Sequence, residues 1–183
     1  MRIPFSAYAS DCTVTAEVEL ETDRLSDFLA ATEGFDVDHA AFQALDDGRI
    51  VEADGPTIQL DDLCIIAATG PRGRPERRLW TRQYPARARL GPYTVYGYLH
   101  AAPTIDPFKN ADRRTVLAFS SSVVEYDFCG EPTRVETETV LLNRAKIETL
   151  DPVTAAEFGP ATRPELKTVV DPRSKDLTGD VFA

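Results

Sequence analysis

The stretch TVLLNRAKIETL, residues 139–150, consists of an apolar strand pattern, a short polar break and a second strand pattern. The stretch TIQLDDLCIIAA, residues 57–68, has the same shape. The polar pair in each stretch, Asn143–Arg144 or Asp61–Asp62, is expected to form a single turn that redirects the chain. Small β-barrels need such a break before a strand, because a closed sheet must turn corners.

The segments before these two stretches also recur in the same order. TVTAEVELETDRLSDFL (13–29) matches TVYGYLHAAPTIDPF (94–108), and FDVDHAAFQAL (35–45) matches TVLAFSSSVVEY (115–126). Order, spacing and apolar pattern agree, although few residues are identical. We interpret this agreement as a tandem duplication of a unit of roughly 65 residues. The alternative is that two ordinary β segments align by chance.

The local patterns within each unit favour strands. Thr13–Leu20 alternates apolar and polar residues, which is typical of a strand with one buried face. Helical patterns are scarce. A short helix is expected around Leu25–Leu29, with Thr22 or Asp23 as its N-cap, and another at 151–159, with Asp151 as its cap.

We therefore expect an all-β protein with two tandem small barrels, SH3-like or Sm-like, or two sandwiches, with short helical turns. The first β repeat is expected at residues 1–69 and the second at residues 93–159. An Arg- and Pro-rich linker at 70–92 separates them, and an extended or disordered tail occupies 160–183.

Five short strands with a break before the last resemble SH3-like barrels, among them the Sm-like barrels. The signature glycines of the Sm-like barrels and the Asp/Asn pair of their RNA site are absent. The paired patterns RLSDFL…F…AL and VLLNR..I also resemble a small bacterial β-domain family of unknown function, over residues 13–68 and 94–150. These motifs are apolar, so the resemblance implies a fold and no activity.

Charge is distributed unevenly along the chain, whose formal net charge is −10. Residues 1–69 carry 15 acids and 3 bases, whereas residues 70–114 carry 10 bases and 3 acids. The overall sign argues against sequence-blind binding to nucleic acid or to an anionic membrane. The basic middle of the chain leaves a local nucleic-acid site open.

The predicted linker contains the residues that we select as binding candidates. Guanidinium groups and aromatic rings are what a groove for an anionic polymer needs, because they supply bidentate contacts and stacking faces. The basic linker could instead lie across the acidic first repeat, or meet the acidic repeat of a second copy. The candidates are Arg72, Arg74, Arg77, Arg78, Trp80, Arg82 and Tyr84, and the basic run continues with Arg87 and Arg89.

Catalytic motifs are not evident. Asp36 and Asp38 share one face of a predicted strand, whereas His39 points to the opposite face and so does not complete a metal site with them. We interpret the two aspartates as a solvated acidic strand face. His100 is interpreted as a strand-end histidine without a local nucleophile. There is no GxSxG, Walker or GxGxxG motif, and two histidines with three scattered cysteines do not suggest a zinc site. We expect no catalytic residues, no cofactor and no metal.

The three cysteines are Cys12, Cys64 and Cys129, which are widely spaced and fit reduced thiols better than a disulfide framework. The longest apolar run, 63–68, is far shorter than the roughly 20 residues that a membrane span requires. The N-terminal residues show no secretory signal. Cytoplasmic localisation is the expectation.

The sequence favours a non-catalytic adaptor, scaffold or regulatory subunit that contacts another protein or itself. The alternative is a module that binds RNA or single-stranded nucleic acid through the Arg-rich linker and a tyrosine face formed by Tyr93, Tyr96 and Tyr98. A third hypothesis is a small-ligand enzyme with a site between the repeats.

Overall fold

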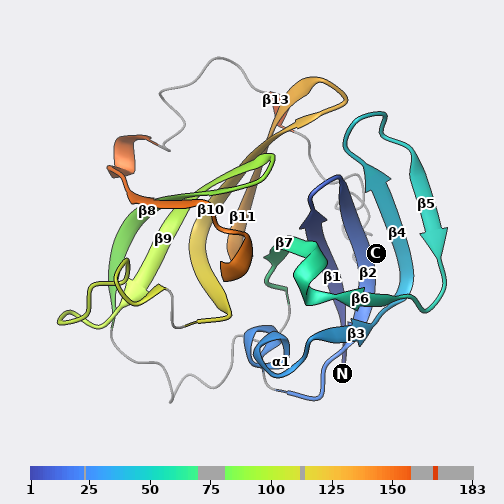
Figure 1. Cartoon of the computed structure of the whole chain (residues 1–183), viewed down its shortest axis with the longest axis horizontal. Coiled ribbons are helices and arrows are strands. Elements are labelled where there is room, and N and C mark those ends of the chain that lie inside the picture. Colours follow the sequence, from blue (N-terminus) through green and yellow to red (C-terminus); the bar gives the residue numbers. More distant parts are fainter. Residues whose placement is uncertain (23, 70–80, 112–113, 158–166, 169–183) are drawn as a thin grey trace, which may run out of the picture.

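The computed structural model describes residues 1–22, 24–69, 81–111, 114–157 and 167–168. Within these residues the chain is all-β, as predicted, and most strands belong to one eleven-stranded sheet. A second sheet contains two strands. Figure 1 shows the first half of the chain, coloured blue to green, side by side with the second half, coloured yellow-green to red.

The first half begins with a β-hairpin and ends with the short strand in the stretch 57–68. One α-helix, α1 (Leu25–Ala31), follows the hairpin and buries Leu25 and Leu29. A 3-10 turn, η1 (Leu60–Asp62), precedes the last strand. The strands are β1 (Arg2–Ala9), β2 (Cys12–Glu19), β3 (Gly34–Asp36), β4 (Asp38–Ala44), β5 (Ile50–Ala53), β6 (Thr57–Gln59) and β7 (Leu63–Ala67).

The second half contains the longest strands of the sheet, β8 to β11, which have 9, 9, 13 and 13 residues. A 3-10 turn, η4 (Arg144–Lys146), precedes β12, and another, η5 (Ala155–Glu157), follows it. The short strand β13 (Lys167–Thr168) pairs in parallel with β11. The other strands are β8 (Arg82–Leu90), β9 (Tyr93–Ala101), β10 (Val116–Phe128), β11 (Glu131–Asn143) and β12 (Thr149–Pro152).

The two halves place their strands in the same spatial order. Across the large sheet the order is β12-β8-β9-β10-β11, followed by β7-β1-β2-β4-β5. In each half the last strand therefore lies beside the first, and the hairpin that follows the first two strands lies on the other side. The halves join where β11 pairs with β7, so one continuous sheet runs through both.

The 3-10 turns occur where the sequence predicts a break between two strands. η1 contains the polar pair Asp61–Asp62, and η4 begins directly after Asn143. The Asn143 side chain accepts a hydrogen bond from the backbone N–H of Ala145 at 3.1 Å, which caps the turn. The predicted single turn is confirmed at both places.

A β-bulge occurs at the same point of each half. The pairing of β2 with β4 shifts between Thr15 and Glu17, and the pairing of β9 with β10 shifts between Ser120 and Val123. Each bulge contains a non-glycine residue in the left-handed region, His39 with φ 50° and Ser121 with φ 48°. An extra residue in a bulge bends its strand, so β4 and β10 both bend at these residues.

Two large hydrophobic cores, one centred on each half, and a small third cluster around Tyr96 and Val123 pack the described residues, and the joint strand β7 belongs to both large cores. Leu63 and Ile66 pack in the first core, whereas Cys64 and Ile65 pack in the second. Cys64, one of the three free cysteines, is buried. The two faces of β7 are therefore covered by different halves of the chain.

The prediction of two closed barrels is not confirmed, because no described sheet is closed. The physical reason lies at the joint. One edge of β7 pairs with β1 and the other pairs with β11, so the last strand of the first half contributes both its edges to one open sheet.

Some predicted boundaries need correction. Residues Arg82–Leu90, predicted to lie in the linker, form β8, a nine-residue strand of the second half. Asp151 and Pro152 lie in β12 rather than at the start of a helix. Arg24 is the N-cap of α1 and makes no side-chain capping bond. The predicted cap Thr22 therefore does not start this helix, and the other predicted cap, Asp23, lies outside the described residues.

Candidate interaction edges and the pocket beside β12

The large sheet ends at β12 on one side and at β5 on the other. Among the described strands, none pairs with the outer edge of either. The outer edge of β6, which pairs only with β3, is likewise open. Such edges carry backbone N–H and C=O groups that are available to another chain.

The β5 edge presents apolar side chains to solvent. Ile50 is 56% exposed and Val51 is 57% exposed, which is unusual for large aliphatic residues. The backbone N–H of Ala44 donates to Arg49 O at 2.9 Å, so every second residue after Arg49 faces β4. Ile50 and Glu52 therefore turn their backbone groups outward.

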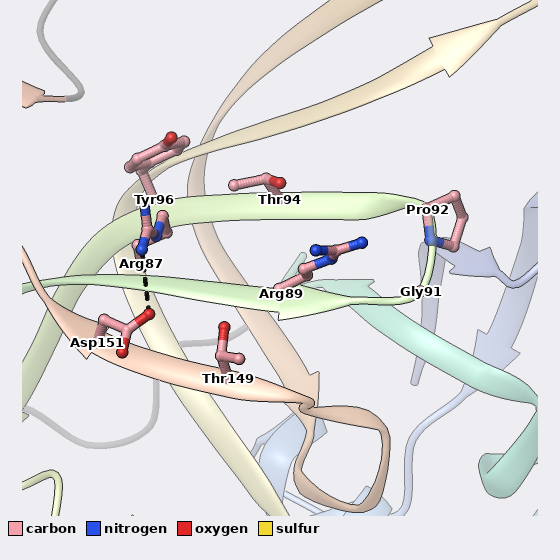
Figure 2. A pocket seen from close by; sticks show the side chains of 8 residues that line it. All are labelled: Arg87, Arg89, Gly91, Pro92, Thr94, Tyr96, Thr149 and Asp151. Carbon is pink, nitrogen blue, oxygen red and sulfur yellow. Dashed lines mark hydrogen bonds and ion pairs between the residues drawn. The ribbon is translucent and has the colours of Figure 1, made fainter.

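The β12 edge borders a pocket of about 550 Å³ on the outer face of the second half (Figure 2). The pocket lies over β8, β9 and β12, and its lining is mostly polar. Figure 2 shows that Arg87 lies between Tyr96 and Asp151. The lining residues are Arg87, Arg89, Gly91, Pro92, Thr94, Tyr96, Thr149 and Asp151.

Both arginines of the pocket already have carboxylate partners. Arg87 Nη2 donates to Asp151 Oδ2 at 3.1 Å, and this hydrogen bond is the main reason that the pKa of Arg87 is raised. Arg89 Nε lies 3.5 Å from a carboxylate oxygen of Glu148, whose other oxygen accepts from the Gly91 N–H at 3.1 Å. These contacts fasten β12 to β8, and they leave the pocket little net positive charge for a phosphate.

The binding candidates chosen from the sequence are only partly described. Arg82 and Tyr84 lie on β8, Arg82 exposed and Tyr84 packed against the second core. Neither lines the pocket; the arginines that do are Arg87 and Arg89, further along the same strand. The remaining candidates, Arg72, Arg74, Arg77, Arg78 and Trp80, lie outside the described residues.

The predicted tyrosine face needs correction. Tyr93 is fully buried and donates its hydroxyl to Ala9 O at 2.6 Å, which ties the second half to the first. Tyr96 lies on the opposite face of β9 and is 7% exposed, packed beside Tyr98. Because strand side chains alternate, these three tyrosines do not form one open stacking platform.

His100 has a local hydroxyl partner that sequence reasoning missed. Its Nε2 lies 2.6 Å from Ser120 Oγ and its Nδ1 lies 3.2 Å from Thr81 Oγ1. A threonine carries no negative charge to stabilise an imidazolium, unlike the aspartate of a catalytic triad. In the first half, Asp38 occupies the position of Ser120 and forms an ion pair across the sheet with Arg2 at 2.9 Å. We interpret both contacts as cross-strand links.

The acidic strand pair does not form a metal site. Asp36 accepts from Thr57 Oγ1 at 2.6 Å, whereas Asp38 pairs with Arg2. Within the described part of the chain, no three or more His, Cys, Asp or Glu side chains are grouped to hold a metal ion. In the same residues, no helix is long and apolar enough to cross a membrane.

Comparisons with protein-family models, curated proteins and solved structures found no match.

Proposed function

We propose that this protein is a non-catalytic scaffold or adaptor that binds other proteins along the open edges of its sheet. The observation that carries the proposal is the β5 edge, where Ile50 and Val51 are more than half exposed beside outward-facing backbone groups. An extended segment that adds to such an edge gains main-chain hydrogen bonds, and exposed apolar side chains supply further contact.

The proposal includes the idea that the two halves are copies of one barrel-like unit. It is supported by the common strand order, the bulges at His39 and Ser121, and the two 3-10 turns. Because the joint uses one edge of each half, the large sheet keeps two open edges of different kinds, β5 in the first half and β12 in the second. A protein built in this way can hold two partners at fixed spacing, as a scaffold requires.

The nucleic-acid alternative has less support. Arg87 and Arg89 are engaged by Asp151 and Glu148, and Tyr96 is almost fully buried. A phosphate would have to displace those carboxylates.

A substitution at Glu52 tests the proposal. Proline at this position removes an N–H that points away from β4, so the fold should tolerate it while the edge loses a donor. The full-length chain and its Glu52→Pro variant are used as bait in an extract of the native host, followed by cross-linking and mass spectrometry. We expect the variant to lose partners whose cross-links map to β5.

The matched control is Glu52→Ala, which removes the same side chain but keeps the N–H. It should retain the partners. Equal capture by the two variants would contradict the proposal, and capture that disappears after nuclease treatment would favour the nucleic-acid alternative.

A further inference from the structure

We infer that the β6 edge of one copy of this chain pairs with the β12 edge of a second copy. This contact repeats between chains the joint that β11 and β7 form within the chain. The inference rests on the proposed function, because it takes the open sheet edges as binding surfaces and names their occupant. Its basis is a position-by-position match between the joint and the two free edges.

The joint within the chain defines the geometry. Ala68 donates its backbone N–H to Thr139 O at 3.0 Å, and Leu141 is opposite Ile66. In an antiparallel pair, every second residue turns its backbone groups to the same neighbour. Ile66 and Ala68 therefore face β11, and Thr139 and Leu141 face β7.

Leu150 of β12 is the counterpart of Ile66. Ile66 pairs with Ala7, which lies two positions before the end of β1. Leu150 pairs with Ala88, which lies two positions before the end of β8. The two strands hold the same place in their halves.

Thr57 of β6 is the counterpart of Leu141. Leu141 pairs with Ala118 of β10, which lies three positions before Ser121, the residue of positive φ. Thr57 pairs with Asp36 of β3, which lies three positions before His39, the residue of positive φ in the first half. The segment of β11 that makes the joint therefore corresponds to β6.

The backbone of β6 is oriented for this contact. Pro56 O accepts from the Val37 N–H at 3.1 Å, so Pro56 faces β3. Its neighbour Thr57 then turns both its N–H and its C=O outward. Thr57 is exposed, and its side chain is held by Asp36 on the neighbouring strand.

The backbone of β12 matches it, with one difference. Val153 donates to Pro85 O at 3.1 Å, so Val153 faces β8, whereas Leu150 and Pro152 turn outward. Pro152 is the counterpart of Ala68, whose N–H donates in the joint, but a proline has no N–H to donate. The contact between copies therefore lacks one hydrogen bond of the joint within the chain.

A side-chain amide is present at the same place in the joint and at the free β6 edge. Asn143, directly before η4, donates from Nδ2 to Leu60 O and Leu63 O across the joint, each at 3.0 Å. Gln59 holds the same place directly before η1, and it is exposed. In the contact between copies it can reach the turn of the neighbouring chain that corresponds to η1.

The flanking positions add opposite charges. In the joint, Tyr8 and Phe128 both pack against the second core. Tyr8 is the second-last residue of β1, and the second-last residue of β8 is Arg89. Phe128 lies seven positions after Ser121, and the residue seven positions after His39 is Asp46. The contact between copies thus brings Arg89 towards an acidic turn, where Asp46 would share it with Glu148 of its own chain, and salt should weaken this shared contact.

The first test is the mass of the full-length chain by light scattering over a range of protein and salt concentrations. We expect a species larger than a monomer that dissociates on dilution and at high salt. Thr57→Pro, which removes one outward N–H, should be monomeric. Thr57→Ala loses the same hydroxyl and keeps the N–H, so it should still associate.

The second test strengthens the contact instead of breaking it. Pro152→Ala restores the N–H that Ala68 has in the joint, and one added hydrogen bond should tighten association about fivefold. Because this substitution removes a constraint from an exposed strand end, the result does not depend on a damaged fold.

The inference is overturned if the wild type and Pro152→Ala are both monomeric at every concentration, or if Thr57→Pro associates as the wild type does. A monomer that still captures a host partner sensitive to Glu52→Pro overturns the inference and leaves the proposed function standing. A monomer without such a partner contradicts both.

Discussion

The joint between β7 and β11 and the free edges of β6 and β12 share one backbone plan but differ in their side chains. At the joint, five aliphatic residues are at most 2% exposed: Ile65, Ile66, Val140, Leu141 and Leu142. At the free edges, Thr57 and Thr149 are exposed. Burial of aliphatic side chains stabilises the joint permanently, because the hydrophobic contribution grows with the apolar area removed from water. The free edges keep the hydrogen-bonding groups with little of this contribution, which suits a reversible contact.

The largest difference is expected between Ile66→Ala and Leu150→Ala, which change corresponding positions. Ile66 is fully buried between the halves, so its truncation should lower the free energy of unfolding by about 2–5 kcal/mol. Leu150 is half-buried, so its truncation should cost less. Urea unfolding measures both. Equal losses in the free energy of unfolding would contradict the difference in packing between the joint and the β12 edge.

The amide positions should differ by a smaller amount. Asn143→Ala leaves two buried carbonyl oxygens without their donor and should lower the free energy of unfolding by about 1–3 kcal/mol. Gln59→Ala, at the exposed counterpart, should change it by no more than about 0.5 kcal/mol in the monomer. Thermal unfolding of dilute protein is a suitable measurement. A large loss from the glutamine variant would contradict the assignment of Gln59 to a free edge.

The tyrosines beside the joint predict loss of stability in alkali. Burial raises the pKa of Tyr8, Tyr93 and Tyr126 above the ordinary value. The unfolded state loses these protons first, near pH ~10. The folded state, which keeps them, is therefore destabilised as the pH rises above that value. For the fully buried Tyr93 the loss is about 1.4 kcal/mol per pH unit.

Denaturant unfolding at several alkaline pH values, with tyrosinate absorbance recorded in parallel, measures this effect. Tyr93→Phe is the control, because it removes the titrating hydroxyl and should flatten the pH dependence. It also loses the hydrogen bond to Ala9 O, so its stability at neutral pH should be slightly lower. Tyrosine ionisation that precedes unfolding would contradict the buried placement.

The smallest effect is expected at the β12 pocket. Arg87 and Asp151 are each nearly half exposed, so breaking their ion pair with Arg87→Ala should cost between zero and about 1 kcal/mol. A double-mutant cycle with Asp151→Ala measures the coupling free energy. A coupling of several kcal/mol would indicate that the pocket is more rigid and more shielded than its exposure suggests, and would make it a stronger candidate for ligand binding.

The sequence was sufficient to predict the secondary-structure elements whose local patterns are simple. The all-β class, the alternating strand after Thr13 and the two strand–turn–strand motifs follow from periodicity and from polar pairs at a break. The first strand of each half, β1 and β8, was not recognised. Both contain a proline, Pro4 and Pro85, and proline normally argues against a strand within a sheet.

The β8 strand carries a signal that the arginine count obscured. Ala86, Ala88 and Leu90 are fully buried, and they alternate with the exposed Arg87 and Arg89. This period of two is the pattern of a half-buried strand. The pairing of β11 with β7 could not be predicted in the same way, because periodicity shows which face of a strand is buried and says nothing about which strand lies beside it.

The double burial of β7 has a consequence for how the chain can fold. One strand supplies Leu63 and Ile66 to the first core and Cys64 and Ile65 to the second, and Leu141 of the second half packs in the first core. A cut on either side of β7 therefore removes residues from both cores or from the core that loses the strand. Neither half is a separable module, however similar the two are in plan. We expect the whole molecule to melt in a single cooperative transition, and proteolysis between the halves to release fragments that do not hold their shape.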